Sequence, residues 1–448
     1  MHHNKRLKTL AFLSAVIGAL AAGGLTAHAQ TDTNAATKLE QENQELRKRV
    51  DNLEHILEKE GLKPSDNKAA DPPVAAMTSI SISGFVETSY FSDLGDAHDN
   101  HPPGYLWNSS LNSFTLNKIK LTLASPAVDK DKFDAAYRAS FIWGSDAPVV
   151  DTGSHTTVDG TSVAAGNGFS WIREAYLELN VPVGTGLDLR AGDLISLLNY
   201  ESGDGGAVND NFSQAYDWYY TGNPPNVGIQ AGYDFNNYVG IKLRLQNGLY
   251  SGPVSIGPKT FIGGLYVNPV KIASLAFLGF AGHQDFSPGW DIAGGSFIGS
   301  LKIITNCNFT LGTEADYFRF SSFDSTVAGF PGAATSGDFW SIAAWLGVDL
   351  SDKFRLALRG EYLGDPTGFG TWYNSPAPLS DASFPTGVYA TGAGQDLESV
   401  TLTLDYKPVP TIKVQPEIRW NHSNYASGFG IDGKKDQVIV GMGVSYLF

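Results

Sequence analysis

Charged side chains in this sequence fall at positions from which they could act together on ions. Lys and Arg recur at every second or fourth position in several short segments, and an extended strand places such residues on one face. Rings of charged side chains around a polar passage set which ions cross it. The basic positions are Lys118, Lys120, Lys132, Arg138, Arg190, Lys242, Arg244, Arg355, Arg359, Lys413 and Arg419. The acidic positions, in a segment without Lys or Arg, are Glu201, Asp204, Asp210 and Asp217.

The acidic segment, residues 199–224, would create a transverse field if it folded into a passage lined by the basic residues. Two other interpretations stay open. The basic residues could pair with acids on neighbouring strands and only solvate a wall. The acidic segment could be an ordinary external loop. Aromatic residues in the segment would pack it against the wall or offer a stacking surface for sugars, and packing is the simpler role.

β-Strands are the elements that must position these charges. From Ser79 to Phe448, about sixteen short segments alternate apolar and polar residues. Seven short turns and eight long loops alternate between them. An outward apolar face, an inward polar face and loops of alternating length are the signature of a transmembrane β-barrel. The sequence therefore predicts an all-β, antiparallel transmembrane barrel of about 16 strands, with 14 or 18 as alternatives because residues 270–303 alternate poorly.

A soluble β-sandwich or propeller would also alternate. Residues 79–448 would then need several sandwich domains, and no repeat of about 40–50 residues indicates propeller blades. Aromatic residues gather near the predicted strand ends, where a membrane barrel places its interfacial girdles. A membrane barrel is therefore the preferred prediction.

Composition excludes several classes of protein. A net charge of −15 argues against nucleic-acid binding. The single cysteine, Cys307, excludes an intrachain disulfide and a cysteine-based zinc cluster. Asp93, Asp96 and Asp99 could hold calcium, but their spacing does not match a dedicated calcium loop. No nucleotide motif and no nucleophile–base pattern is visible, so we predict no cofactor, no metal and no enzyme activity.

The N-terminus has the three parts of a secretory signal peptide over residues 1–29. A basic start at Lys5, Arg6 and Lys8 precedes an apolar run over 10–22 and an Ala-His-Ala cleavage site at 27–29. A short segment, 30–36, follows. We therefore expect the mature chain to leave the cytoplasm.

Residues 37–60 are expected to form a short coiled-coil helix, and 61–78 a Pro-containing linker. A solvated amphipathic helix is the alternative. About three heptads are marginal alone, so the helix would join chains that another interface already holds. The coiled-coil core positions are Leu39, Asn43, Leu46, Val50, Leu53 and Leu57.

The C-terminal strand resembles the assembly signal of bacterial outer-membrane proteins, in which alternating apolar residues end on Phe. The assembly-signal positions are Val440, Met442, Val444, Tyr446 and Phe448. The segments 187–192, 197–201, 211–216 and 417–423 resemble the OmpL-like putative β-barrel porin family, and the resemblance covers 79–448. It implies a homotrimer that is inserted by the barrel assembly machinery and lets small hydrophilic solutes cross passively.

These patterns predict an outer-membrane porin, with the barrel in the lipid of the bacterial outer membrane and the N-terminal helix in the periplasm. Ions and small hydrophilic solutes would diffuse through a water-filled lumen. A substrate-selective, sugar-type channel is one alternative. A tether between outer membrane and cell wall is another, although about 24 helical residues reach only about 36 Å.

Overall fold

The structure is a computed structural model that describes residues 80–95, 110–147, 157–158, 161–162, 171–250, 257–284, 290–303, 308–322, 336–367, 394–424 and 434–448. The chain divides into two units, 1–79 and 80–448. The predicted signal peptide, segment 30–36, coiled-coil helix and linker therefore lie outside the described residues. Among the described helices, none combines the length and the apolar character that crossing a membrane requires.

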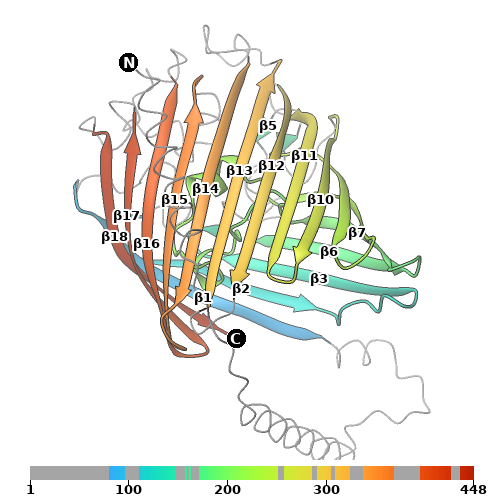
Figure 1. The fold of residues 1–448 in the computed structure, drawn as a ribbon, viewed down its shortest axis with the longest axis horizontal. Helices are drawn as coiled ribbons and strands as arrows, with labels where there is room; N and C mark the ends of the chain where they lie inside the picture. Colours follow the sequence, from blue (N-terminus) through green and yellow to red (C-terminus); the bar gives the residue numbers. More distant parts are fainter. Residues whose placement is uncertain are drawn as a thin grey trace, which may run out of the picture. The chain divides into compact units, whose positions relative to one another are not determined.

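Sixteen of the described strands, from β1 to β18, form a closed barrel in which each strand is antiparallel to both of its neighbours (Figure 1). The barrel strands are β1 (Ser81–Asp93), β2 (Ser113–Ala124), β3 (Asp134–Trp143), β6 (Ile172–Val181), β7 (Leu187–Leu194), β8 (Asn226–Asp234), β9 (Val239–Gln246), β10 (Thr260–Val270), β11 (Ala273–Gln284), β12 (Trp290–Ile303), β13 (Phe309–Ser321), β14 (Gly337–Asp349), β15 (Phe354–Asp365), β16 (Gln395–Val409), β17 (Ile412–Ser423) and β18 (Asp436–Leu447). The prediction of a 16-stranded antiparallel barrel is confirmed. Two short strands, β4 (Thr157–Val158) and β5 (Thr161–Ser162), form a separate sheet.

The barrel closes where its first strand meets its last. Strand β1 pairs with β18, and Phe85 lies opposite Leu447. The Gly84 N–H donates to the carbonyl oxygen of Phe448 at 2.8 Å, and the Phe448 N–H donates back at 3.0 Å. Because both edges of the sheet are used in this pairing, no strand of the barrel presents an unpaired edge.

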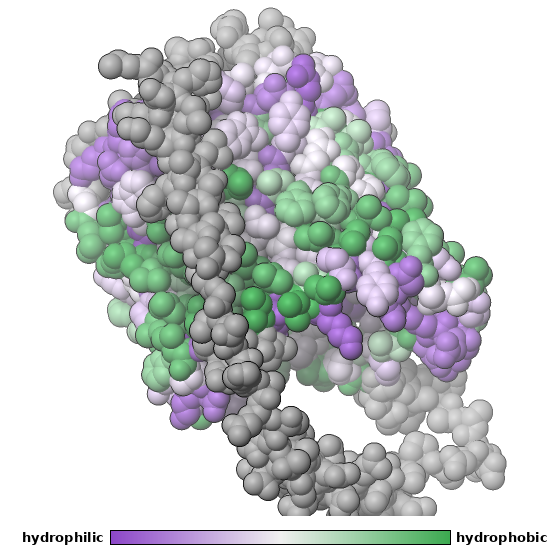
Figure 2. Space-filling model, in the orientation of Figure 1, coloured by the Kyte–Doolittle hydropathy of each residue, from purple (hydrophilic) through white to green (hydrophobic). Residues whose placement is uncertain are grey.

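The two faces of the wall differ in polarity, as the alternation predicts. On β18, Met442 and Tyr446 are exposed, whereas Gln437 and Ser445 are buried inside the barrel. Figure 2 shows apolar residues in a band across the face in view, with polar residues towards both ends. Such an apolar belt is suited to lipid, because lipid offers no hydrogen bonds to polar groups.

Short and long connections alternate around most of the barrel. The exception lies on either side of β12, where the connections 285–289 and 304–308 are equal in length. The turn between β8 and β9 spans only 235–238, whereas the connection between β7 and β8 spans 195–225. We call residues 195–225 the inner loop. It contains a 3-10 turn, η2 (Gly205–Ala207), and a short helix, α5 (Tyr216–Thr221), and both are buried.

An outward-facing charge should destabilise the barrel most at mid-strand. Leu402 lies near the centre of β16 and is exposed, so we expect Leu402→Arg to lower the free energy of unfolding by about 2–4 kcal/mol. Val409→Arg, at the end of the same strand, is the control and should cost only about 0–1 kcal/mol. Urea unfolding in phospholipid vesicles measures both, and equal losses would contradict the placement of the belt.

Candidate functional site

The inner loop lies within the barrel because its backbone is hydrogen-bonded to the wall. N–H groups of the loop donate to carboxylates that point inward from separate strands. The contacts are Ala207 to Glu87 on β1 (2.7 Å), Tyr200 to Glu314 on β13 (2.8 Å), Asp217 to Glu361 on β15 (3.1 Å) and Phe212 to Glu417 on β17 (2.7 Å). These buried glutamates attach the loop along one side of the barrel, from β13 through β18 to β1.

Aromatic residues of the inner loop pack against the wall. Tyr216, Tyr219 and Tyr220 belong to a buried cluster with wall residues such as Phe318 and Phe339. The aromatic residues of the loop therefore pack it against the wall, which is the simpler of the two roles predicted from the sequence. Burial of such rings away from water is a major source of stability.

Glycines of the wall make room for two other rings. A Cβ at Gly443 would lie 2.0 Å from the Phe212 ring, and one at Gly312 would lie 2.2 Å from the Tyr200 ring. The loop therefore approaches the wall so closely at these two positions that a wall residue larger than glycine would clash with it.

Three of the four acidic residues predicted in the loop contact basic residues of the wall. Glu201 lies 2.8 Å from Arg359 on β15, and Asp210 lies 2.9 Å from Arg355 on the same strand. Asp204 lies 3.2 Å from Arg173 on β6 and also contacts Lys120 on β2. The opposite charges are in direct contact, so they do not face each other across open lumen at these points.

Asp204 shows the electrostatic effect of this pairing. Burial alone would raise its pKa, but the charges of Arg173 and Lys120 outweigh burial and hold the pKa below its ordinary value. A buried carboxylate stays ionised when cations compensate the lost hydration.

The fourth acidic residue, Asp217, has different surroundings. It contacts Ser341 on β14 and lies beside two other acids, Glu314 and Asp316 on β13. Burial raises the pKa of Asp217 to about 6. Among the described residues, no Lys or Arg forms an ion pair with Asp217, so the predicted opposition to a basic wall residue is not found at this position.

Other predicted basic residues hold the loop or the wall. Arg419 contacts the carbonyl of Gln214, and Lys413 donates to the carbonyl of Gly206 at 2.9 Å. Arg244 donates to the carbonyl of Ile195 at 2.7 Å, where the loop begins. Lys118 instead pairs with Glu87 at 2.6 Å and with Asp146 at 3.1 Å.

Basic residues on β3, β7 and β9 remain partly accessible. The side chain of Arg138 is 38% exposed and lies 2.6 Å from Glu174. Arg190 is 31% exposed and pairs with Asp188 at 3.1 Å. The Lys242 ammonium lies 4.6 Å from the centre of the Tyr266 ring, and no ion pair to it is found among the described residues.

Lys132 does not lie on a strand, which corrects the sequence prediction. Its side chain is 63% exposed in the turn before β3 and pairs with Asp129 at 3.4 Å. The alternation of residues 132–138 extends past the strand, which begins only at Asp134.

Arg173 was not predicted from the sequence as an inward-facing basic residue, because a β-bulge disturbs the alternation there. The register between β3 and β6 shifts between Ser140 and Phe141, and the neighbours Arg173 and Glu174 are both buried. A β-bulge re-aims side chains and so defeats a period-two prediction. Glu314 and Asp316 were also missed, although their spacing by two is the signal that could have found them.

A closed barrel with an apolar exterior, a polar interior and a loop attached inside defines the class of outer-membrane channels. The comparisons agree with this class. The family described as "Putative beta-barrel porin-2, OmpL-like" matches residues 79–448, and the chain belongs to this family. The predicted family and the prediction of an outer-membrane porin are thereby confirmed.

Solved structures share the fold at low sequence identity. An anion-selective porin from Comamonas acidovorans matches with a TM-score of 0.50 and 11% identity, over 83% of this chain and 99% of that one. OprB of Pseudomonas putida matches with a TM-score of 0.50 and 10% identity, over 84% and 96%. The channel DcaP of Acinetobacter baumannii matches with a TM-score of 0.48 and 14% identity, over 82% and 97%. A search of curated proteins found no match.

Removing the charge of Arg359 should weaken the attachment of the loop. Arg359→Met would leave Glu201 buried without its closest cation, and breaking a buried pair in this way costs about 3–5 kcal/mol. The exposed pair of Arg319 and Asp338, at 3.2 Å, supplies the control, and Arg319→Met should cost about 0–1 kcal/mol. Urea unfolding measures both variants, and a loss below 1 kcal/mol for Arg359→Met would refute the anchoring role.

Proposed function

We propose that this porin passes ions and small hydrophilic solutes by passive diffusion. The observation that carries the proposal is the partial exposure of Arg138, Arg190 and Lys242 inside the closed barrel. The inner loop is attached mainly to strands other than those that carry these three residues. Charged side chains that keep water access within a barrel line an aqueous route. The inner loop narrows that route, and its acids are the proposed constriction residues.

The described contacts support general diffusion over a sugar-selective channel. Trp345 shares the inward face, but its Nε1–H donates to Glu201 at 2.8 Å and its ring lies 4.6 Å from the Tyr200 ring. Its surface is therefore used in holding the loop. A sugar-type channel would need aromatic faces open to the lumen, whereas Trp345 is buried and Tyr200 is half-buried against it.

The assembly around the barrel is also a proposal. We propose a homotrimer, inserted through the alternating apolar residues that end on Phe448, with a signal peptide over 1–29 and a periplasmic coiled coil over 37–60. A role of that helix as a tether to the cell wall is secondary, because it would be only about 36 Å long.

Single-channel conductance in a planar bilayer tests the diffusion route. The purified chain should open in stable steps, grouped in threes for a trimer, without nucleotide or a protein partner. Refolded barrel that inserts but opens no channel would overturn the proposal. Folding of the barrel is checked independently by gel electrophoresis, in which the heated, unfolded protein should migrate more slowly than the unheated protein.

Lys242 should contribute to ion preference because it carries charge without an ion pair among the described residues. Lys242→Gln removes a positive charge from the lumen, so the ratio of cation to anion permeability should rise roughly 1.5- to 2-fold. The reversal potential under a salt gradient measures this ratio.

Arg319→Gln removes one positive charge from the exposed outer face and is the matched control for that measurement. It should leave the reversal potential unchanged. An equal shift in both variants would mean that Lys242 acts through overall charge and not from the lumen.

A further inference from the structure

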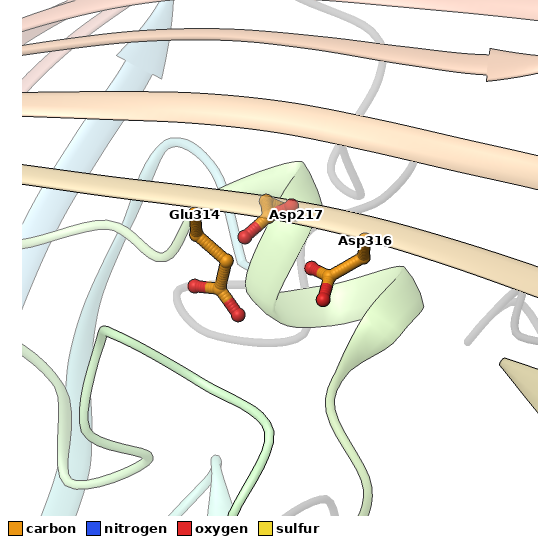
Figure 3. A group of neighbouring side chains, drawn as sticks. All are labelled: Asp217, Glu314 and Asp316. Atoms are coloured by element: carbon orange, nitrogen blue, oxygen red, sulfur yellow. The ribbon is translucent and has the colours of Figure 1, made fainter. Parts of the chain in front are cut away.

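Three acidic side chains meet where α5 lies against β13. Asp217 comes from the helix, and Glu314 and Asp316 come from the strand (Figure 3). One oxygen of each carboxylate lies within 4.8 Å of the others, and all three residues are at most 4% exposed. The site therefore joins the inner loop to the barrel wall.

Glu314 and Asp217 each accept a hydrogen bond through one carboxylate oxygen. Glu314 Oε2 accepts from the Tyr200 N–H at 2.8 Å, Asp217 Oδ1 accepts from the Ser341 hydroxyl, and Asp316 Oδ2 lies 3.4 Å from the same hydroxyl. The remaining oxygens, Glu314 Oε1, Asp217 Oδ2 and Asp316 Oδ1, are buried and accept no hydrogen bond from the described N–H and O–H groups. The carboxyl group of Asp217 lies close enough to those of Glu314 and Asp316 for a shared proton or a cation to join them. Buried polar atoms normally make hydrogen bonds or bind an ion, so three buried carboxylates whose oxygens converge are suited to a positively charged ligand.

The charge of this site is not balanced by the described residues. No Lys, Arg or His among them lies within 4.0 Å of any of the three carboxylates. A further charged group that acts on Asp217 is Glu361 on β15, which is itself acidic. Adjacent buried carboxylates repel one another unless a cation or protons separate them.

We propose that Asp217, Glu314 and Asp316 bind one divalent cation, with Ca²⁺ as the preferred ion. An all-oxygen, carboxylate-rich set suits a hard cation and excludes the softer metals that favour nitrogen or sulfur. Oxygens up to 4.8 Å apart fit Ca²⁺, whose bonds of about 2.3–2.6 Å allow opposite ligands to lie at about that separation. Mg²⁺ demands a smaller and more regular cage.

The bound ion would attach α5 to β13 at Asp217. Of the loop's four predicted acidic positions, Asp217 is the one that pairs with no basic residue in the part of the chain that the structure describes. Glu201, Asp204 and Asp210 use wall cations for the same purpose. The ion would thus complete the electrostatic attachment of the inner loop, and its removal would loosen α5 in particular.

Isothermal titration calorimetry with CaCl₂ tests the site on the purified full chain in detergent at pH 7.5. The wild type should bind one Ca²⁺ per chain with an affinity that Asp217→Asn and Glu314→Gln each reduce at least tenfold. Asp338→Asn, which removes an exposed carboxylate from the outer face, should bind as the wild type does. Because Asp217 lies on the loop and not on a strand, its variant leaves the pairing of the barrel strands intact.

Thermal unfolding with and without Ca²⁺ separates a metal site from shared protons. Ca²⁺ should raise the unfolding temperature of the wild type and of Asp338→Asn, but not of Asp217→Asn. Two results would overturn the proposal: equal Ca²⁺ binding by all variants, or no response of the wild type to Ca²⁺. If the wild type does not respond and the site variants are more stable than the wild type without Ca²⁺, protons neutralise the cluster.

Discussion

The arrangement of the lumen depends on the pairing of buried charges between the inner loop and the wall. Arg359 is fully buried, and it can remain charged there because Glu201 and the loop carbonyl of Ser213 contact it. The glutamates of the wall in turn accept the loop's backbone N–H groups. Burying either partner alone would be very unfavourable, so the loop and the wall determine each other's position.

This mutual dependence explains why the lumen is uneven. The loop's ion pairs with β15 and its aromatic packing on β13 and β14 fill that side of the interior. Side chains on β3, β7 and β9 keep some access to water. The size of the opening therefore depends on which strands the loop leaves uncovered, as well as on the diameter of the barrel.

Much of the fold could be predicted from sequence because membrane strands must alternate. The face of Met442 and the face of Ser445 follow directly from a period of two. Prediction failed where local geometry departs from that period. The bulge beside Ser140 buries both Arg173 and Glu174, and the late start of β3 leaves Lys132 in a turn. Alternation does not encode which wall residue each loop acid contacts, because these contacts depend on long-range packing. The position of Asp217 beside two other acids is one such contact.

The pairing of β1 with β18 has a consequence for the order of folding. Phe85 and Leu447 are neighbours in the sheet but lie at opposite ends of the barrel sequence. One edge of β1 must therefore stay unsatisfied until the last strand has been synthesised and placed. Such a long-range contact makes closure a late and slow event, so the exported chain needs protection from aggregation throughout its journey to the membrane.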